Sequence, residues 1–497
     1  MIELSVREAR VYFSGQESDL AGMFKALRLK DKNAFWKAKF LIRKLTGYGM
    51  SEEERTEKIA KIKESAKWIR FYDRRTDSFP TGLLPRVIRR LDKRHVRYEI
   101  EDLRRPLPKG LDDNVKFHFR DKVEERPEQI EALRKALKRG SGLLHAAPNF
   151  GKTEIACAIV GVFRKKIGRL PNTIFLVHRA SLAIQTAERF RKHLGLRVHV
   201  IGGGKGKKFG GVTIATVQTA SRMVKYSTAF KDWLSKTDIV FVDEFHVNKA
   251  KQVQAVMDRC RARMRFGLSG TIDRTSKEKL LRYVGMTGPI VAEISNRELI
   301  ALGRSAQPHI RLVEVPGWED TVDGSYGTAY RECIVKDKKR NKLVRREAIR
   351  YADKDMQVLV TVSRIRHGLI LRDMFESRDI RCEFMSGSTP MFIRKKILDS
   401  FKGRRFPVLI ASPIFDTGMD VPEIQAWVNA AGGKGWELVV QRLGRTLRRK
   451  KERNVVFITD FLDRRSPYLA KHSLLRWDYY KEEGAKIKIV RVGGDQS

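Results

Sequence analysis

One segment of the chain has the residue types and spacing that bind nucleotide phosphates. It ends in Gly151-Lys152-Thr153 and follows an apolar run, Gly142–Ala146, that has the character of a buried strand. A helix is expected to begin at Thr153. Strand, loop and helix is the context in which backbone N–H groups and a helix N-terminus hold phosphates. Lys152 would neutralise the β/γ oxygens, and Thr153 would ligate Mg²⁺.

The loop departs from the GxxxxGK[ST] pattern at two places. Ala146 stands where the pattern has its first glycine, and Asn149-Phe150 occupies the middle of the loop. We still expect Asn149, Phe150 and Gly151 to bind the nucleotide together with Lys152 and Thr153. These departures affect the detailed structure expected for the loop, not the assignment of the chain.

A second motif places two carboxylates at the end of an apolar strand. Asp243-Glu244 follows Ile239–Val242, and strands of a parallel sheet present ligand-binding residues at their carboxyl ends. Asp243 would hold Mg²⁺ through water, and Glu244 would orient and deprotonate an attacking water. An acidic strand end is common in itself, but its spacing after Gly151-Lys152-Thr153 favours nucleotide hydrolysis.

Arg126 and Gln129 precede the loop by about 25 residues. The Gln129 amide could read the edge of an adenine by two hydrogen bonds. An ordinary solvated helix start is the alternative for this segment.

A third motif lies nearly 300 residues after the loop. Arg445 and Arg448 are three residues apart, so on a helix they share one face. Their guanidinium groups can donate hydrogen bonds to the oxygens over which a departing phosphoryl group spreads its charge. Gln441 could position water or Arg445. Upstream, Gly418 and Asp420 are candidates for nucleotide contacts, Asp420 for a ribose hydroxyl. A basic surface helix is the alternative, because further lysines and arginines follow.

These residues require two α/β lobes to position them. Apolar runs alternate with helical stretches, and this predicts parallel sheets covered on both faces. The strands expected in the first lobe are Gly142–Ala146, Thr173–Val177, Val212–Ala215, Ile239–Val242 and Phe266–Ser269, and those in the second are Gln357–Val362, Arg381–Met385, Val408–Ala411, Ala426–Ala430 and Asn454–Ile458. We therefore expect an α/β protein with two tandem parallel-sheet lobes.

We divide the chain into five parts. Residues 1–112 form a small α+β accessory domain, with a capping box at Ser51–Glu54. Residues 113–312 form the ATP-binding lobe, 313–351 a linker or inserted hairpin, 352–465 the C-terminal lobe and 466–497 a basic tail. A short helix of the first part carries Arg86, Arg89 and Arg90, which we favour as DNA contacts. A solvated basic face is the alternative.

Composition indicates a polyanionic partner. The 497 residues carry 102 Lys+Arg against 59 Asp+Glu, a formal charge of +43, and this favours nucleic acid over an anionic membrane. We see no run of about 18 apolar residues and no signal-peptide pattern at the start. The four cysteines form no CxxC pair, so we expect a reducing, cytoplasmic compartment.

Taken in order, these motifs resemble superfamily 2 helicases. The match runs over about residues 119–460, and the Glu-Phe-His and Ser-Gly-Thr forms are similar to XPB-like and phage branch-migration (UvsW-like) helicases. Phe71–Asp73 and Phe79–Leu84 also resemble the phage group. The resemblance implies RecA-like lobes, use of ATP with Mg²⁺, and roles in recombination, repair or replication, with 3′→5′ polarity.

The resemblance also implies roles for further residues. His246, Ser269 and Thr271 would couple the ATP site to the nucleic-acid track, although His246 could also be a satisfied core histidine. The phosphodiester backbone would be contacted by Arg179, Thr216 and Gln218 in the first lobe and by Ser363 and Arg364 in the second.

We therefore expect an ATP-dependent DNA helicase or translocase that acts on forked or branched DNA, as a monomer and without a membrane partner. The resemblance suggests the cytoplasm of a bacterium or of a phage-infected cell. An RNA helicase of the same superfamily and a duplex translocase without strand separation remain open. A non-enzymatic DNA-architectural protein would explain the charge but not the ordered motifs.

Overall fold

The computed structural model describes residues 1–31, 33–43, 50–204, 206, 208–244, 250–270, 276–317, 319–412, 424–433 and 454–491. Their contacts form two compact units. The first unit holds residues 1–145 and 153–293, and the second holds residues 146–152 and 294–497. Within the described parts, no helix has the length and apolar character needed to cross a bilayer.

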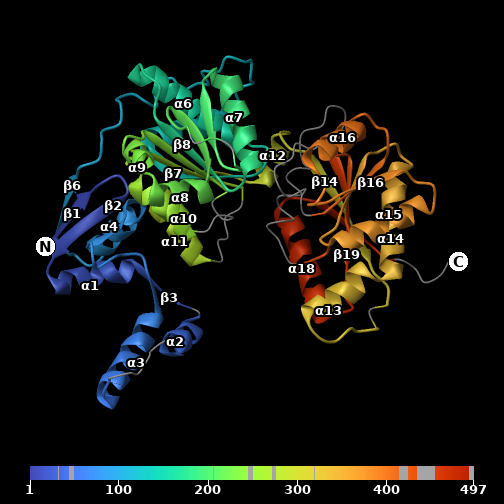
Figure 1. The fold of residues 1–497 in the computed structure, drawn as a ribbon, viewed down its shortest axis with the longest axis horizontal. Helices are drawn as coiled ribbons and strands as arrows, with labels where there is room; N and C mark the ends of the chain where they lie inside the picture. Colours follow the sequence, from blue (N-terminus) through green and yellow to red (C-terminus); the bar gives the residue numbers. More distant parts are fainter. Residues whose placement is uncertain are drawn as a thin grey trace. The chain divides into compact units, whose positions relative to one another are not determined.

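The first unit begins with a small α+β domain (Figure 1). Its described residues form a four-stranded sheet in the order β5-β2-β1-β6. Alternate residues of β1, namely Ile2, Leu4 and Val6, are buried against the helices α1 and α4. The elements are β1 (Ile2–Val6), β2 (Arg10–Gly15), α1 (Glu17–Ala26), β5 (Ser78–Pro80), the 3-10 turn η1 (Thr81–Leu83), α4 (Leu84–Asp92) and β6 (Tyr98–Asp102).

A segment of two helices and two short strands is inserted between α1 and β5. It consists of β3 (Arg28–Lys30), α2 (Ala34–Arg43), α3 (Glu52–Ala66) and β4 (Trp68–Arg70). The predicted capping box is confirmed, because the Ser51 hydroxyl accepts from the Glu54 N–H and the Glu54 carboxylate accepts from the Ser51 N–H.

The accessory domain is packed against the lobe that follows it. Gly82 contacts the α11 segment so closely that a Cβ there would collide with the carbonyl oxygen of Val284. Arg105 donates to the carbonyl oxygens of Thr237 (2.9 Å) and Arg261. This packing explains why a glycine stands in the Phe79–Leu84 segment.

The first lobe is built on one parallel sheet. Among described residues it has seven strands in the order β13-β7-β12-β11-β8-β10-β9. Its elements are α5 (Pro127–Arg139), β7 (Ser141–Ala146), α6 (Lys152–Ile167), β8 (Thr173–Val177), α7 (Ala180–Leu194), β9 (Val198–Ile201), β10 (Val212–Thr216), α8 (Val217–Tyr226), α9 (Thr228–Ser235), β11 (Ile239–Asp243), α10 (Ala250–Arg259), β12 (Met264–Ser269), α11 (Lys277–Thr287) and β13 (Ile290–Ile294).

Helices cover both faces of this sheet. The helices α8 to α11 pack over one face in a single core cluster that includes Leu176, Val240 and Val242. The helices α6 and α7 lie over the other face (Figure 1), where Phe190 of α7 meets Phe175 edge to face. All five expected strands are present, each within two residues of its predicted start.

The second lobe has the same plan. Its described strands form a seven-stranded parallel sheet in the order β16-β17-β15-β18-β19-β14-β20. Its elements are α12 (Asn296–Ala301), β14 (Gln307–Glu314), α13 (Tyr326–Tyr330), the π-helical turn η3 (Arg331–Val335), α14 (Lys338–Ala352), β15 (Val358–Thr361), α15 (Ile365–Glu376), β16 (Cys382–Met385), α16 (Met391–Lys402), β17 (Val408–Ala411), β18 (Ala426–Asn429), β19 (Val455–Leu462), α18 (Pro467–Glu482) and β20 (Lys486–Val490).

Opposite faces of this sheet carry different helices. Val358 and Val360 of β15 face α14 and α15, while Leu359 faces α16 and α18. The buried Arg476 of α18 binds the carboxylate of Asp460 in β19 at 2.8 Å. Burial alone would raise the pKa of Asp460, but the charge and hydrogen bonds of Arg476 lower it.

Two segments differ from the expected division of the chain. The stretch 313–351 is not a linker or hairpin outside the lobes, because its first two residues end β14 within the second sheet and α14 contributes Leu343 and Val344 to the core. Likewise residues 466–491 form α18 and β20 rather than a tail, and Tyr480 is fully buried. Both segments are rich in lysine and arginine. These charged residues stand between the buried apolar ones in the sequence, so the apolar periodicity was not recognised.

Candidate active site

The acidic pair lies at the carboxyl edge of the first sheet. The register pairs Asp243 with Leu268 of β12, and Ser269 of β12 with His145 of β7. The ends of β11, β12 and β7 therefore meet at one edge, as expected for parallel strands. Ser269, which we expected to couple ATP to nucleic acid, is almost fully buried at this edge.

Glu244 directly follows β11 and has a left-handed backbone, with φ of 43°. For a residue with a long side chain this conformation is uncommon and costs about 1–3 kcal/mol. Asp243 and Glu244 are both partly exposed. Glu244 is the residue that the sequence predicts as the general base.

The predicted phosphate loop leaves β7 and enters α6 at Lys152. Asn149 and Gly151 both have positive φ, 72° and 93°. Asparagine tolerates this conformation better than most residues, and successive N–H groups in such a turn form an anion-binding concavity. Asn149 therefore suits its position in the loop, and Phe150 beside it is buried.

The Lys152 ammonium is held by the loop itself. Its Nζ donates to the carbonyl oxygens of Ala146 (2.6 Å) and Ala147 (3.3 Å). The N–H of Ala147 in turn donates to the carbonyl of Ile294 at 2.9 Å. Thr153 is the second residue of α6, the position from which a hydroxyl would reach Mg²⁺ in the predicted arrangement.

Arg126 and Gln129 lie at the start of α5. Arg126 is the extended N-cap residue and Gln129 is almost fully buried within the first turn. Burial of Gln129 shows that this is not a wholly solvated helix start. Its proposed contact with an adenine stays a prediction.

Several predicted residues lie outside the described residues. These are His246, Thr271, Gly418, Asp420, Gln441, Arg445 and Arg448. Their assigned roles stay predictions from the sequence.

The expected nucleic-acid contacts fall into two groups. Arg179 and Arg364 are exposed N-cap residues of α7 and α15, and Gln218 is exposed as the second residue of α8. Ser363 is partly exposed beside Arg364. In contrast, Thr216 is buried and its hydroxyl caps α8 by accepting from the Thr219 N–H. Of Thr216 and Gln218, Gln218 is therefore the more accessible to a nucleic acid.

The three arginines of α4 also differ from one another. The Arg86 guanidinium donates to the carbonyl of Ala26 at 2.7 Å, and partial burial lowers its pKa, although the residue as a whole is exposed. Arg86 therefore helps to hold α4 against α1. Arg89 donates to Pro85 within its own helix and is exposed, while Arg90 is partly exposed.

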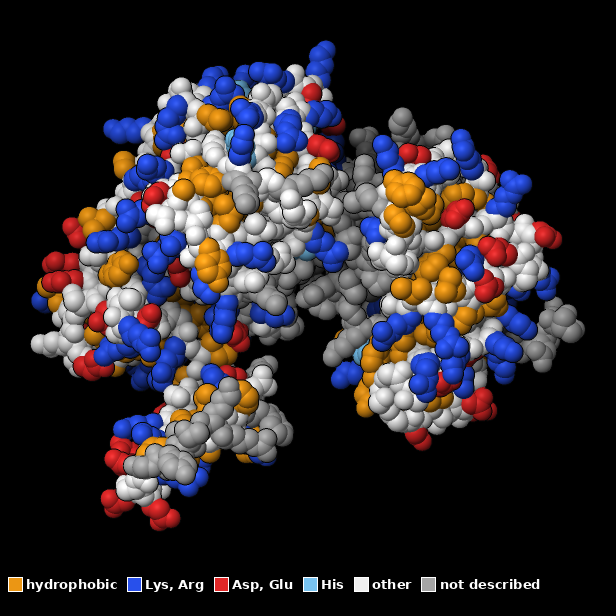
Figure 2. Space-filling model, viewed as in Figure 1, with side chains coloured by type: hydrophobic (Ala, Val, Ile, Leu, Met, Phe, Trp, Pro, Cys, Tyr) orange, Lys and Arg blue, Asp and Glu red, His pale blue; other side chains and the backbone are white. Residues whose placement is uncertain are grey.

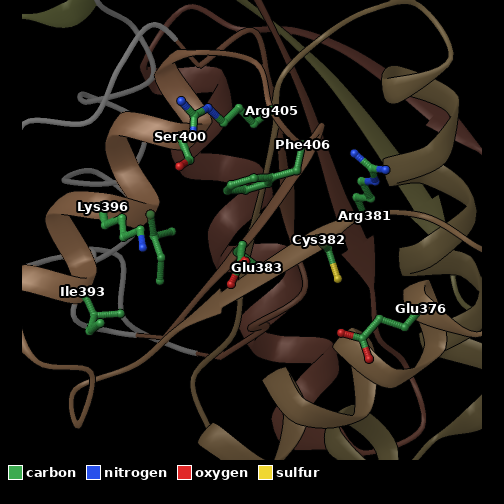
Figure 3. Close-up of a pocket in the computed structure, with 10 residues that line it drawn as sticks. Glu376, Arg381, Cys382, Glu383, Ile393, Lys396, Ser400, Arg405 and Phe406 are labelled. Atoms are coloured by element: carbon green, nitrogen blue, oxygen red, sulfur yellow. The ribbon is translucent and has the colours of Figure 1, made fainter.

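A cavity of about 640 Å³ lies on the second lobe beside the edge strand β16 (Figure 3). Glu383 and Cys382 enter it from β16, Lys396 and Ser400 enter from α16, and the Phe406 ring lies between them. Burial raises the pKa of the Cys382 thiol to about 12, so this thiol is not a nucleophile at neutral pH. The cavity has none of the predicted nucleotide residues.

Comparison with known proteins matches both lobes to helicase domains. Residues 122–274 match the family "Type III restriction enzyme, res subunit", and residues 338–450 match "Helicase conserved C-terminal domain". The chain is 24% identical over 388 residues to the ATP-dependent DNA helicase uvsW of Enterobacteria phage T4, covering 73% of this chain and 76% of that protein. It is 26% identical to the DNA 3'-5' translocase XPB2 of Sulfurisphaera tokodaii, covering 68% and 82%.

The fold is shared with solved helicase structures. A variant of S. cerevisiae Dbp5 bound to RNA and ADP BeF3 matches with a TM-score of 0.51 and 16% identity, over 76% of this chain and 95% of that chain. Two parallel sheets with helices on both faces, joined in tandem, define RecA-like lobes. The two family matches and the shared fold support an ATP-dependent helicase of superfamily 2 type, similar to the UvsW and XPB helicases.

Proposed function

We propose that this helicase acts on DNA and that forked or branched DNA is its substrate. The observation that carries the ATP-driven part of the proposal is the carboxyl edge of the first sheet, where Asp243 ends β11 and Glu244 follows it, in the sheet whose strand β7 leads into the Lys152 loop. The relatives named as DNA enzymes, uvsW and XPB2, support DNA over RNA.

In this proposal the residues divide the work of ATP hydrolysis. The N–H groups of the loop and the Lys152 ammonium bind the β/γ-phosphates. Thr153 and Asp243 would hold Mg²⁺, which supplies charge neutralisation to the phosphates. Glu244 accepts a proton from the attacking water. From the sequence, we assign Gln441 to positioning of the water or of Arg445, and Arg445 and Arg448 to the charge of the departing phosphoryl group.

Charge supports a nucleic-acid partner. Lys and Arg side chains are spread over the visible surface of each lobe, with fewer Asp and Glu side chains among them (Figure 2). With a formal charge of +43, backbone contacts would make binding strong, independent of sequence and sensitive to salt. Arg179, Gln218, Ser363 and Arg364 are the contacts we propose along the tracked strand.

A substrate panel tests this function. We expect ATPase activity to be stimulated by DNA and unwinding to be greatest on forks or Holliday junctions, with 3′→5′ polarity. The panel contains single strand, duplex, fork, Holliday junction and RNA. Stimulation by RNA alone would instead identify an RNA helicase, and movement on duplex without strand separation would identify a duplex translocase.

The accessory domain provides a separate prediction. The double substitution Arg89→Ala/Arg90→Ala should weaken fork binding about tenfold and reduce the salt dependence of binding by roughly two phosphate contacts. Arg86 is left in place because it holds α4. Fluorescence anisotropy at several salt concentrations measures both effects, and Arg378→Ala/Lys402→Ala, two exposed cations of the second lobe, is the control. Equal affinities for the two variants would rule out this contact.

A further inference from the structure

A second basic surface lies on the second lobe, at the edge of its sheet formed by β14 and β20. The register pairs His309 with Lys486 and Arg311 with Lys488. These four residues point to the same face of the sheet, because the intervening Ile310 and Ile487 face the core under α16 and α18. One face of this edge is thus apolar and buried, and the other carries cations.

A cavity of about 300 Å³ opens on the cationic face. Five cations line it: Arg311 from β14, Arg350 from the end of α14, Lys354 from the turn that follows α14, and Lys486 and Lys488 from β20. Among the described residues that line it, none is acidic. The rings of His309 and Phe457, 5.9 Å apart, form part of its wall.

Little of this charge is neutralised by neighbouring carboxylates. The buried Glu347 accepts from Arg311 at 2.8 Å and lies 3.6 Å from Arg350. Ion pairs within the described residues do not include Lys354, Lys486 or Lys488, and all three are exposed. The burial of His309 and the charge of Lys486 lower the His309 pKa, as expected where the local field is positive.

Protection of the sheet edge does not account for the whole cluster. Lysines on an edge strand such as β20 discourage pairing with another chain, and Lys486 and Lys488 fit that role. Arg350 belongs to α14 and Lys354 to the turn that follows it, so neither contributes to edge protection. Cations from three separate elements that converge on one cavity are the arrangement expected for an anion.

We propose that this surface, formed by Arg311, Arg350, Lys354, Lys486 and Lys488, binds the phosphate backbone of a duplex arm of the DNA substrate. Met356, beside the cavity, precedes β15, whereas Ser363 and Arg364 follow it. Seven residues at about 3.3 Å each separate the two ends by roughly 23 Å. The surface therefore contacts a part of the substrate other than the strand tracked at Arg364, and this inference rests on the proposed function.

The charge-reversal variant Lys486→Glu/Lys488→Glu tests the proposal. We expect its affinity for a fork to fall by tenfold or more, with a salt dependence reduced by about two phosphate contacts. Affinity for single-stranded DNA and the maximal ATPase rate on single strand should match those of the unmodified protein. Lys354→Glu, in the turn after α14, should produce a smaller loss in the same direction.

The matched control reverses two exposed lysines on helices that cover the opposite face of the same sheet, Lys395→Glu/Lys481→Glu. Thermal unfolding of each variant monitors the fold. The proposal is overturned if the two double variants bind forks equally, or if single-stranded DNA loses as much affinity as the fork. Failure of the proposed function is distinguishable, because the unmodified protein would then show no stimulation of ATPase by DNA.

Discussion

Replacing Lys152 with alanine is expected to lower the DNA-stimulated ATPase rate by about 10³-fold, which corresponds to roughly 4 kcal/mol of transition-state stabilisation. The Lys152 ammonium is already held at the loop by the carbonyls of Ala146 and Ala147. A positively charged donor fixed in place before the phosphates arrive loses little free energy to reorganisation, and such groups dominate phosphoryl transfer. Unwinding should disappear together with hydrolysis.

The control for this variant is Lys165→Ala, which removes an exposed lysine from the other end of α6. It should leave the ATPase rate within about twofold, since it lies outside the phosphate loop. Steady-state ATP hydrolysis with saturating DNA and strand separation on a fork are the measurements. If Lys152→Ala retained both activities, the loop would not be the phosphate site.

The strands that carry the candidate site could be predicted closely from the sequence, because continuous apolar runs such as Ile239–Val242 are fully buried in a parallel sheet. The acidic pair at the end of β11 followed directly from that placement. The loop was predicted in position but not in conformation. Positive φ at Asn149 becomes interpretable when the backbone is known.

The segments that were not predicted are those in which charge obscures periodicity. In α14, the core residues Val344 and Ala348 stand between lysines and arginines, so the helix resembles a solvated linker by composition. In β20, the alternation Lys486-Ile487-Lys488-Ile489 was a signal for a half-buried edge strand. Such short alternation cannot reveal that β20 pairs with β14, which lies about 175 residues earlier, because pairing depends on tertiary contacts.

The second large effect is expected for Glu244→Gln. Glutamine keeps the size of the side chain and its hydrogen-bonding oxygen but cannot accept the proton of the attacking water. We expect kcat for ATP to fall by about 10²- to 10³-fold, while ATP affinity changes by less than about threefold. The backbone turn at Glu244, with φ of 43°, does not depend on the charge of the side chain, so the local fold should persist.

Glu244→Gln and Lys152→Ala differ in the step that each blocks, and this difference separates general-base catalysis from phosphate binding. With hydrolysis blocked after ATP has bound, Glu244→Gln should retain the ATP-dependent change in DNA affinity that Lys152→Ala loses. Binding of a fluorescent ATP analogue and DNA anisotropy with and without ATP measure the two properties. A Glu244→Gln variant with a normal kcat would remove Glu244 from the proton transfer. A variant that failed to bind ATP would instead place Glu244 among the residues that hold the nucleotide.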